Sequence, residues 1–194
     1  MTEKTEGRTR GSAREEILEA AGGLFYRYGF RAVGVDTVIA EAGVAKMTLY
    51  KHFPGKDDLI VAYLERSDEA FWRWWDGTAE PFAGDPRRQL EAVFAGVAGL
   101  ANSPGCLGCT FTVAAGEFPD PGHPGHRAAR AHKEAVLGRL EELAAAANLR
   151  EPRTVAEQLL LLMDGAWTAA RMFGPGNHAR GVGDAAKLVI GAYV

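Results

Sequence analysis

Between Gly29 and Leu59 the chain reads GFRAVGVDTVIAEAGVAKMTLYKHFPGKDDL, a pattern that predicts two short helices joined by a tight turn. The first helix is expected from about Val35 to Ala42, where the apolar positions recur at helical spacing. Gly43 interrupts that pattern, and a second helix follows from about Ala45 to Phe53, with Leu49 facing inward. The segment therefore predicts a helix-turn-helix.

The second of these helices is too polar to be designed for burial. Leu49 and Phe53 are available for a core, whereas the other side chains are polar, cationic or isolated from apolar neighbours: Lys46, Met47, Thr48, Tyr50, Lys51 and His52. Such a helix suits the major groove of DNA, where side chains meet base edges and phosphates. We therefore expect residues 35–53 to bind DNA.

Most of the remaining chain also follows helical spacing, and no segment alternates at period two, so the sequence predicts an all-α fold. Residues 1–11 are polar and are expected to form an arm. A helix follows, which begins at the capping box of Ser12 and Glu15 and ends at Gly29. A long helix opens at Lys56, with Leu59, Tyr63, Ala70 and Trp74 as its buried stripe. Further helices are expected at about Pro86–Leu100, Cys106–Phe118, Pro124–Ala147, Pro152–Phe173 and Gly183–Tyr193.

Charge is distributed unevenly along the 194 residues. Residues 1–56 carry 9 Lys and Arg against 7 Asp and Glu, a net charge of +2, whereas residues 57–194 carry 13 against 18, a net charge of −5, which together give −3. A basic head on an acidic body suits a protein that presents only its head to phosphates. The sequence therefore predicts a DNA-binding domain at 1–56 and a second helical domain at 57–194.

Several classes of protein are disfavoured by what the sequence lacks. No apolar run reaches the roughly 18 residues that a membrane helix needs, and Met1 to Arg14 lacks the apolar core of a signal peptide. A cytoplasmic protein without a membrane partner is therefore expected. There is no paired-carboxylate site, nucleophile elbow or phosphate-binding glycine loop, so we expect neither an enzyme nor a cofactor.

The residues of the helix-turn-helix resemble the TetR family of transcription regulators. The resemblance covers about 50 residues and rests on combined spacing: Gly29-Phe30, Ile39-Ala40, Ala42-Gly43-Val44, Thr48-Leu49-Tyr50, Phe53, Lys56 and Leu59. It implies a DNA-binding head followed by a larger body that binds a small-molecule effector and dimerises. Repression of transcription is the usual mode of the family, with release from a palindromic operator when the effector binds.

The resemblance also implies roles for individual residues. Thr48, Tyr50 and Lys51 would contact phosphates, and Lys46 and Met47 would read base edges and set sequence choice. His52 and Thr37 would lie near the DNA backbone, and Lys56 would clamp a phosphate beside a helix N-terminus. One departure is Val33-Gly34, where the family often has Thr-Ser. Gly in place of a hydroxyl cap costs a few tenths of a kcal/mol and removes any hydroxyl contact to phosphate there.

The body resembles a subgroup of the family less specifically. That match rests on Pro104-Gly105-Cys106-Leu107, on Glu117-Phe118-Pro119-Asp120-Pro121 and on Ala131-His132-Lys133. An apolar pocket with a few polar groups is expected. Its candidate lining combines aromatic, Met and polar side chains: Phe71, Trp74, Trp75, Phe94, Cys109, Thr110, Phe111, Glu117, His132, Met163 and Trp167. Trp72, Trp74 and Trp75 cannot all face one core from one helix, so at least one faces a partner or a cavity.

Dimerisation follows from the mechanism that the resemblance implies. A two-fold homodimer places two recognition helices about 34–36 Å apart, or at a multiple of this spacing. The helices expected at 124–147 and 152–173 are the candidate dimer faces. Effector binding would shift the helix from Lys56 to Trp75 and so change the spacing of the heads, provided that the effector prefers the state that does not bind DNA.

Cys106 and Cys109 form a C-x-x-C motif that leaves alternatives open. An all-α thiol redox protein would use both cysteines, but no His follows Cys109 closely and no second C-x-x-C completes a zinc site. Redox sensing by a regulator is a second alternative, and a buried packing pair is the third. His123, His126 and His132 with Asp120 are spaced too irregularly for a metal site, so none is expected.

Overall fold

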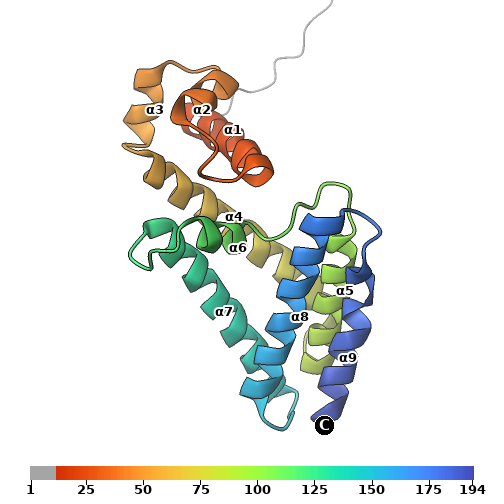
Figure 1. Ribbon diagram of the computed structural model, residues 1–194. Helices are drawn as coiled ribbons and strands as arrows, with labels where there is room; N and C mark the ends of the chain where they lie inside the picture. The colour runs from red at the N-terminus through yellow and green to blue at the C-terminus, as the bar shows by residue number, and fades with distance from the viewer. Residues whose placement is uncertain (1–11) are drawn as a thin grey trace, which may run out of the picture. The chain divides into compact units, whose positions relative to one another are not determined.

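The computed structural model describes residues 12–194, and this part of the chain contains nine α-helices and no strand (Figure 1). The prediction of an all-α fold is thus confirmed, while the predicted arm at 1–11 lies outside the described residues. The helices are α1 (Ala13–Tyr28), α2 (Val35–Ala42), α3 (Lys46–His52), α4 (Lys56–Ala79), α5 (Pro86–Ala101), α6 (Thr110–Glu117), α7 (Pro124–Ala146), α8 (Pro152–Phe173) and α9 (Val182–Ala192). Single 3₁₀ turns, Glu80–Phe82 and His178–Gly181, precede α5 and α9.

Local signals explain most of the helix ends. The Ser12 hydroxyl accepts a hydrogen bond from the backbone N–H of Glu15 (3.4 Å), as the capping box predicts. Asp85 likewise accepts from the backbone N–H of Arg88 (3.1 Å) at the start of α5. The expected start of α6 at Cys106 is wrong by four residues, because Gly108 adopts φ +88°, outside helical geometry.

The chain divides into two compact units, one ending at Tyr63 and the other covering Leu64–Val194. The division lies within α4, further along than the boundary expected after Lys56. The reason is that the first turns of α4 pack with the head: the ring of Tyr63 lies 5.8 Å from that of Phe25 and 5.9 Å from that of Phe30. Leu49 and Phe53 of the same unit are also buried.

The predicted buried stripe of α4 is partly wrong. Leu59 and Tyr63 are buried, but Ala70 is exposed and Trp74 is only half-buried. The fully buried tryptophan is Trp75, which belongs to a stripe one residue further along that also includes Ile60, Leu64 and Ala79. Successive residues of a helix point about 100° apart, so a shift of one residue exchanges a half-exposed for a buried side chain.

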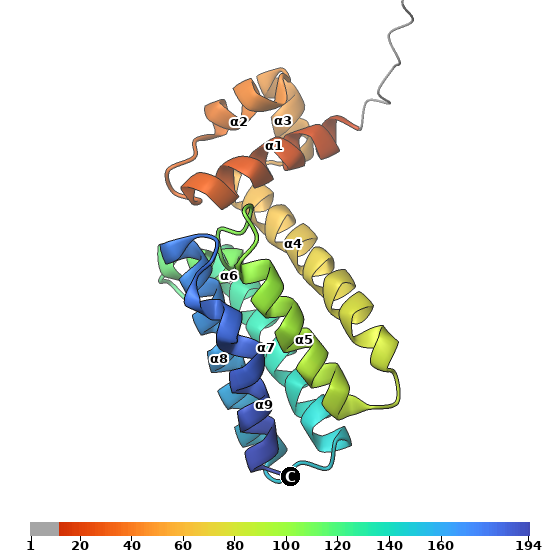
Figure 2. The same cartoon turned by 90° about the vertical axis from the view of Figure 1, so that its right-hand side faces the viewer.

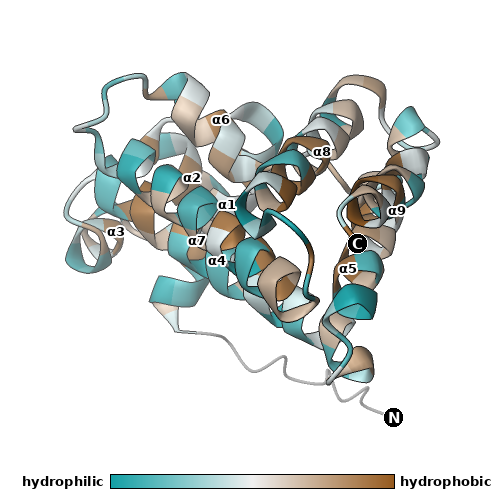
Figure 3. Ribbon diagram, turned by 90° about the horizontal axis from the view of Figure 1, so that it is seen from below, coloured by the Kyte–Doolittle hydropathy of each residue, from teal (hydrophilic) through white to brown (hydrophobic). Residues whose placement is uncertain are grey.

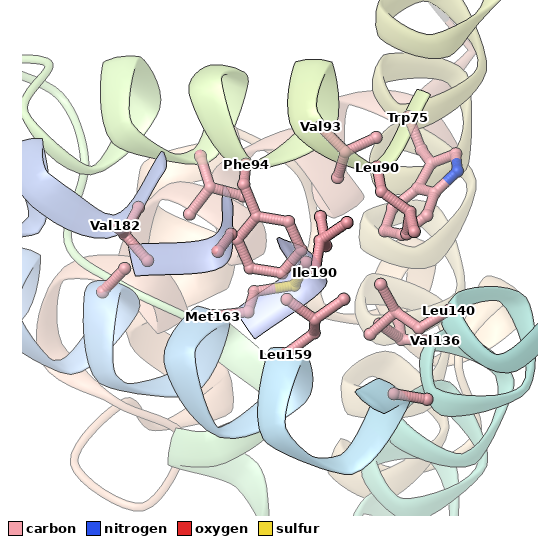
Figure 4. Packing of buried hydrophobic residues seen from close by; sticks show 14 of the residues in the cluster. Trp75, Leu90, Val93, Phe94, Val136, Leu140, Leu159, Met163, Val182 and Ile190 are labelled. Carbon is pink, nitrogen blue, oxygen red and sulfur yellow. The ribbon is translucent and has the colours of Figure 1, made fainter. Parts of the chain in front are cut away.

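The second unit is a bundle of helices around one core. In Figure 2, α5, α7, α8 and α9 run side by side, and in Figure 3 the hydrophobic faces of α5, α8 and α9 are turned toward one another. Figure 4 shows the interior, where Phe94 of α5, Leu159 and Met163 of α8 and Ile190 of α9 interlock. This core holds the walls of any site on the body in place.

Candidate nucleic-acid interface and ligand pocket

The turn between α2 and α3 depends on Gly43. This residue adopts a left-handed conformation, φ +65° and ψ +30°, and its N–H donates to the carbonyl of Ala40 (3.3 Å). The next N–H, of Val44, donates to the carbonyl of Ile39 (3.4 Å), which closes the end of α2. A side chain at position 43 would strain this backbone, so the glycine fixes the angle at which α3 leaves the turn.

The recognition helix predicted from the sequence is α3, and four of its seven side chains are exposed to solvent. Leu49 is 0% exposed and is its one fully buried residue, whereas Met47 is 80% exposed although it is apolar. Three further predicted contact residues, Lys46, Tyr50 and Lys51, are also exposed. The helix thus offers a free face that combines cations, a phenol and an apolar tip, groups that bind phosphates and base edges.

The remaining predicted DNA contacts lie around this face with differing exposure. Thr37, on α2, is exposed, while Thr48 and His52 of α3 are half-buried. Lys56 is also half-buried, and its ammonium group donates to the carbonyl oxygen of Arg31 (3.5 Å) in the loop before α2. Lys56 is the first residue of α4, so its charge adds to the positive end of that helix dipole.

Asp36 is a neighbour of this face that the sequence did not single out. Its Oδ1 lies 3.2 Å from Nζ of Lys46, so a residue of α2 holds the first cation of α3 in an ion pair. The signal available in the sequence was weak, because the two residues are ten positions apart across a turn. The pair places one negative charge at an otherwise cationic surface.

The body contains a cavity of about 480 Å³ between α4, α6 and α7, within the range of small-molecule sites. Helices α6 and α7 contribute mainly apolar side chains to its wall, and α4 contributes acidic side chains. The lining residues are Leu64, Glu65, Asp68, Glu69, Phe111, Ala128, Ala131, His132 and Ala135. We refer to this space as the α4–α7 cavity.

His132 is the central polar group of the α4–α7 cavity. Its Nδ1 lies 2.6 Å from Oδ1 of Asp68, and its ring stacks on that of Phe111 with centroids 3.6 Å apart. The same Asp68 oxygen accepts a hydrogen bond from the indole N–H of Trp72 (3.1 Å). Burial lowers the pKa of His132, against the raising effect of the hydrogen bond to Asp68, so the ring is neutral at neutral pH. Its Nδ1 carries the proton, because a carboxylate only accepts.

The predicted pocket residues are only partly brought together. Phe111 and His132 line the α4–α7 cavity, and Phe71 packs edge-on against the His132 ring at 4.8 Å. Trp75, Phe94, Met163 and Trp167 instead belong to the hydrophobic core, and Trp74 packs against it. Thr110 is buried next to Phe111, and Cys109 and Glu117 are half-buried at the two ends of α6.

The sequence analysis missed the acidic residues of the cavity, Glu65, Asp68 and Glu69, and among them the partner of His132, which is Asp68. A usable signal existed, because Glu65, Asp68 and Glu69 follow the i, i+3, i+4 spacing that places three carboxylates on one face of a helix. What the spacing does not reveal is that this face meets His132, which is 64 residues away along the chain.

The cysteine motif lies in a tightly packed loop. Cys106 and Cys109 form no disulfide within residues 12–194; both are half-buried and pack against the core. Gly108 stands between them so close to α8 that an added Cβ would come within 2.7 Å of the Trp167 carbonyl oxygen. The Arg171 guanidinium also donates to the carbonyl of Leu107 (3.1 Å). These contacts give the motif a role in packing.

The histidines considered for a metal site lie in separate environments. His123 stacks on Phe118, His126 has its Nδ1 2.7 Å from the Phe118 carbonyl oxygen, and His132 pairs with Asp68. Within residues 12–194 no group of three or more metal-ligating side chains comes together. Over the same residues, no helix is both long enough and apolar enough to pass through a lipid bilayer.

Comparisons with known proteins agree with the geometry of the head. Residues 17–63 match the family described as bacterial regulatory proteins, tetR family. A TetR-family transcriptional regulator from Streptomyces coelicolor is 35% identical, with 93% of this chain and 95% of that chain covered and a TM-score of 0.87. A TetR-type regulator from Streptomyces avermitilis is 31% identical, with 94% and 98% covered and a TM-score of 0.80.

Curated relatives match over shorter stretches. The transcriptional repressor DhaR from Mycobacterium sp. is 27% identical over 104 residues, 54% of this chain and 52% of that protein. Relatives with 40–41% identity match this chain over only 26–32% of their own length. All of these relatives are described as transcriptional regulators, and none as an enzyme.

Proposed function

The chain belongs to the TetR family of bacterial transcriptional regulators, and we propose that it is a repressor that binds a palindromic operator as a homodimer. A small molecule bound in the body would release it. The protein would act in the cytoplasm, where a bacterial chromosome lies. One observation carries the proposal: α3 buries Leu49 alone and leaves a cationic, polar face free. An exposed polar helix face that carries the Lys46–Asp36 pair but is not covered by apolar side chains is suited to a groove.

Binding as a homodimer is supported by unpartnered apolar residues on the body. Leu161 of α8 is 73% exposed and Leu188 of α9 is 77% exposed. The helix expected as the second dimer face, α7, instead presents charged side chains such as Arg130 and Glu134. We therefore assign the dimer face to α8 together with α9, since an isologous interface needs a self-complementary apolar centre.

Release by an effector would act through α4. This helix runs without a break from Lys56 to Ala79. It carries Lys56 at its first residue and supplies Glu65, Asp68 and Glu69 to the α4–α7 cavity about two and a half to three and a half turns later. A molecule that binds the cavity better in one position of α4 shifts the population toward that position. Coupling of this kind needs no other connection between the cavity and Lys56.

The alternative function, a thiol redox protein, has no support from the relatives, which are regulators. The contacts of Gly108 and Arg171 explain the C-x-x-C loop as part of the packing of α6 on α8. Repression is supported by the likeness to the repressor DhaR, although one of the relatives with 40–41% identity is described as an activator, so the transcription assay below distinguishes the two modes.

The proposal is tested by selecting duplexes from a random pool with the full-length protein. We expect an enriched inverted repeat whose half-sites are centred about 10–10.5 base pairs apart, or a multiple of this. Tyr50→Ala should then reduce binding of the enriched duplex, measured by fluorescence anisotropy. The matched control is Tyr28→Ala, since Tyr28 is an exposed tyrosine at the far end of α1.

The outcomes separate clearly. Equal losses with Tyr50→Ala and Tyr28→Ala, or an enriched site without two-fold symmetry, contradict the proposed mode of binding. Transcription in vitro from a promoter that contains the enriched site should fall when the protein is added, and a rise contradicts repression.

A further inference from the structure

The α4–α7 cavity is acidic on one side. Glu65, Asp68 and Glu69 of α4 line it, and none of its lining residues is Lys or Arg. Three carboxylates at i, i+3 and i+4 on one helix face repel one another, because like charges at this spacing destabilise a helix. Neighbouring cations normally compensate such a cluster, so the partners of each carboxylate matter.

The protein supplies few counter-charges here. Glu69 has Arg73 at 3.7 Å, but Glu65 has no ion-pair partner within residues 12–194. Lys133, the neighbour of His132 on α7, is paired with Asp164 of α8. Within the described part of the chain, Asp68 receives two hydrogen bonds, from the Trp72 indole and the His132 ring, and both donors are uncharged. The net charge of the cavity wall is therefore negative.

His132 adds a second, independent feature. Its side chain is only 4% exposed, yet it lines the cavity, and its Nδ1 is fixed on Asp68. Its other ring nitrogen, Nε2, has no hydrogen-bond partner among the described residues. With the proton on Nδ1, Nε2 carries a lone pair and can only accept. Nε2 remains accessible from the cavity, so a ligand that donates a hydrogen bond can bind it directly.

The rest of the wall is apolar and flat. The Phe111 ring stacks on one face of the imidazole, and Phe71 packs against its edge. Leu64 and three alanines of α7 complete the surface. A ligand therefore meets hydrophobic area beside a concentrated negative potential and a hydrogen-bond acceptor.

We propose that the α4–α7 cavity binds an organic cation that has at least one ammonium N–H and an apolar body. The N–H donates to Nε2 of His132, the positive charge lies against Asp68 and Glu65, and the apolar body packs along Phe111. This assignment rests on the function proposed above, because it names the chemical class of the effector. It also means that a positive charge is added beside the carboxylates of α4 when the ligand binds.

The test is isothermal titration calorimetry on the full-length protein with three matched probes: 4-phenylbutylamine, its trimethylammonium analogue and 4-phenylbutyrate. The amine should bind at least about tenfold more tightly than the carboxylate. The trimethylammonium compound should lie between them, because it has the charge without the N–H. Equal binding of amine and carboxylate overturns the proposal.

Variants locate the site. Asp68→Asn should weaken amine binding about tenfold, as expected for loss of a charge-assisted contact. Its matched control is Asp76→Asn, an exposed aspartate two turns further along α4 that does not line this cavity. Glu65→Gln, which has no partner to lose, should weaken binding about threefold without affecting the fold. Wild-type affinity for the amine in Glu65→Gln and Asp68→Asn, both folded by circular dichroism, contradicts the assignment.

Operator binding is measured separately so that the two proposals can fail independently. If the amine binds the cavity but leaves operator affinity unchanged, the site assignment stands and effector release is wrong. If the operator is bound normally and the amine binds no better than the carboxylate, the proposed function as a DNA-binding regulator is upheld and the proposed ligand class is wrong.

Discussion

The ammonium group of Lys46 lies 3.2 Å from the carboxylate of Asp36, so the first residue of α3 is paired with the second residue of α2. Both side chains are largely exposed, at 62% and 84%, and exposed pairs contribute about 0–1 kcal/mol to stability. The pair therefore matters less for folding than for the proposed interface. It keeps a carboxylate beside a cation that would otherwise be free to meet DNA.

Asp36→Asn should increase affinity for DNA of any sequence by a few-fold at low salt. The change removes a charge that repels phosphates and releases Lys46, so the dependence of affinity on salt concentration should become steeper. Fluorescence anisotropy titrations on the selected duplex and on a scrambled duplex measure both effects. Glu41→Gln, an exposed carboxylate at the other end of α2, is the matched control. A loss of affinity in Asp36→Asn contradicts this role for the pair.

Lys56→Ala should weaken binding of selected and scrambled duplexes alike. As a phosphate contact, Lys56 contributes affinity without sequence information, and its loss should reduce the slope of log K against log salt by about 1. Lys56→Arg, which keeps the charge, should restore most of the affinity. The stability of the head should change by no more than about 1.5 kcal/mol, the value of the single hydrogen bond to the Arg31 carbonyl. If Lys56→Ala loses affinity only for the selected duplex, Lys56 is not a sequence-independent phosphate contact.

The elements of this fold could be predicted because glycine and proline mark their ends. The bounds of α8 were expected at Pro152 and Phe173 and are observed there, since Pro favours the first helical position and Gly174 ends the helix with φ +68°. The start of α6 was not predicted, because apolar spacing continues through the Cys106–Cys109 loop. Gly108 leaves helical geometry there with φ +88° and lies against Trp167 and Arg171 of α8, a tertiary contact that the spacing does not reveal.

The two candidate sites also differ in whether local sequence or tertiary contacts determine them. The seven residues of α3 include two aliphatic side chains, Met47 and Leu49, and only Leu49 is buried, so most of the exposed face of α3 follows from local sequence. The cavity depends on which distant side chains meet. Phe94 and Met163 have the composition of pocket residues, but they face each other in the core, and composition does not distinguish these two environments (Figure 4). The pairing of Asp68 with His132 is likewise a property of the packing of α4 against α7.

Leu161→Glu and Leu188→Glu should each convert the protein to a monomer at micromolar concentration. An interfacial leucine contributes about 1.5–3 kcal/mol, and two-fold symmetry counts each change twice, so the dissociation constant should rise at least about 100-fold. Sedimentation velocity measures the mass, and unchanged circular dichroism shows that the exposed position is not needed for folding. Leu100→Glu, an exposed leucine of α5, is the control and should remain dimeric. Dimers that persist in both variants contradict the assignment to α8 and α9.

His132 should make the stability of the protein fall as the pH drops below neutrality. Burial lowers its pKa, and Lys133 on the same helix acts in the same direction, while Asp68 of α4 and Asp164 of α8 act against them. In the unfolded chain the imidazole protonates near its ordinary pKa of about 6.5, whereas in the folded protein it stays neutral to lower pH. The unfolded state then binds more protons, so the free energy of unfolding decreases as pH falls through this range.

The slope contributed by one such histidine is at most about 1.4 kcal/mol per pH unit, and it should appear between about pH 7 and 5, above the range where most carboxylates titrate. Urea unfolding at several pH values measures it. In His132→Gln the slope should become shallower, because the buried group that resists protonation is gone. His178→Gln, at an exposed position, should leave the slope unchanged. An identical slope in His132→Gln and wild type would mean that folding does not lower the pKa of the imidazole. The ring would then gain its second proton near its ordinary pKa, and below that pH Nε2 would present a donor to the ligand of the α4–α7 cavity instead of an acceptor.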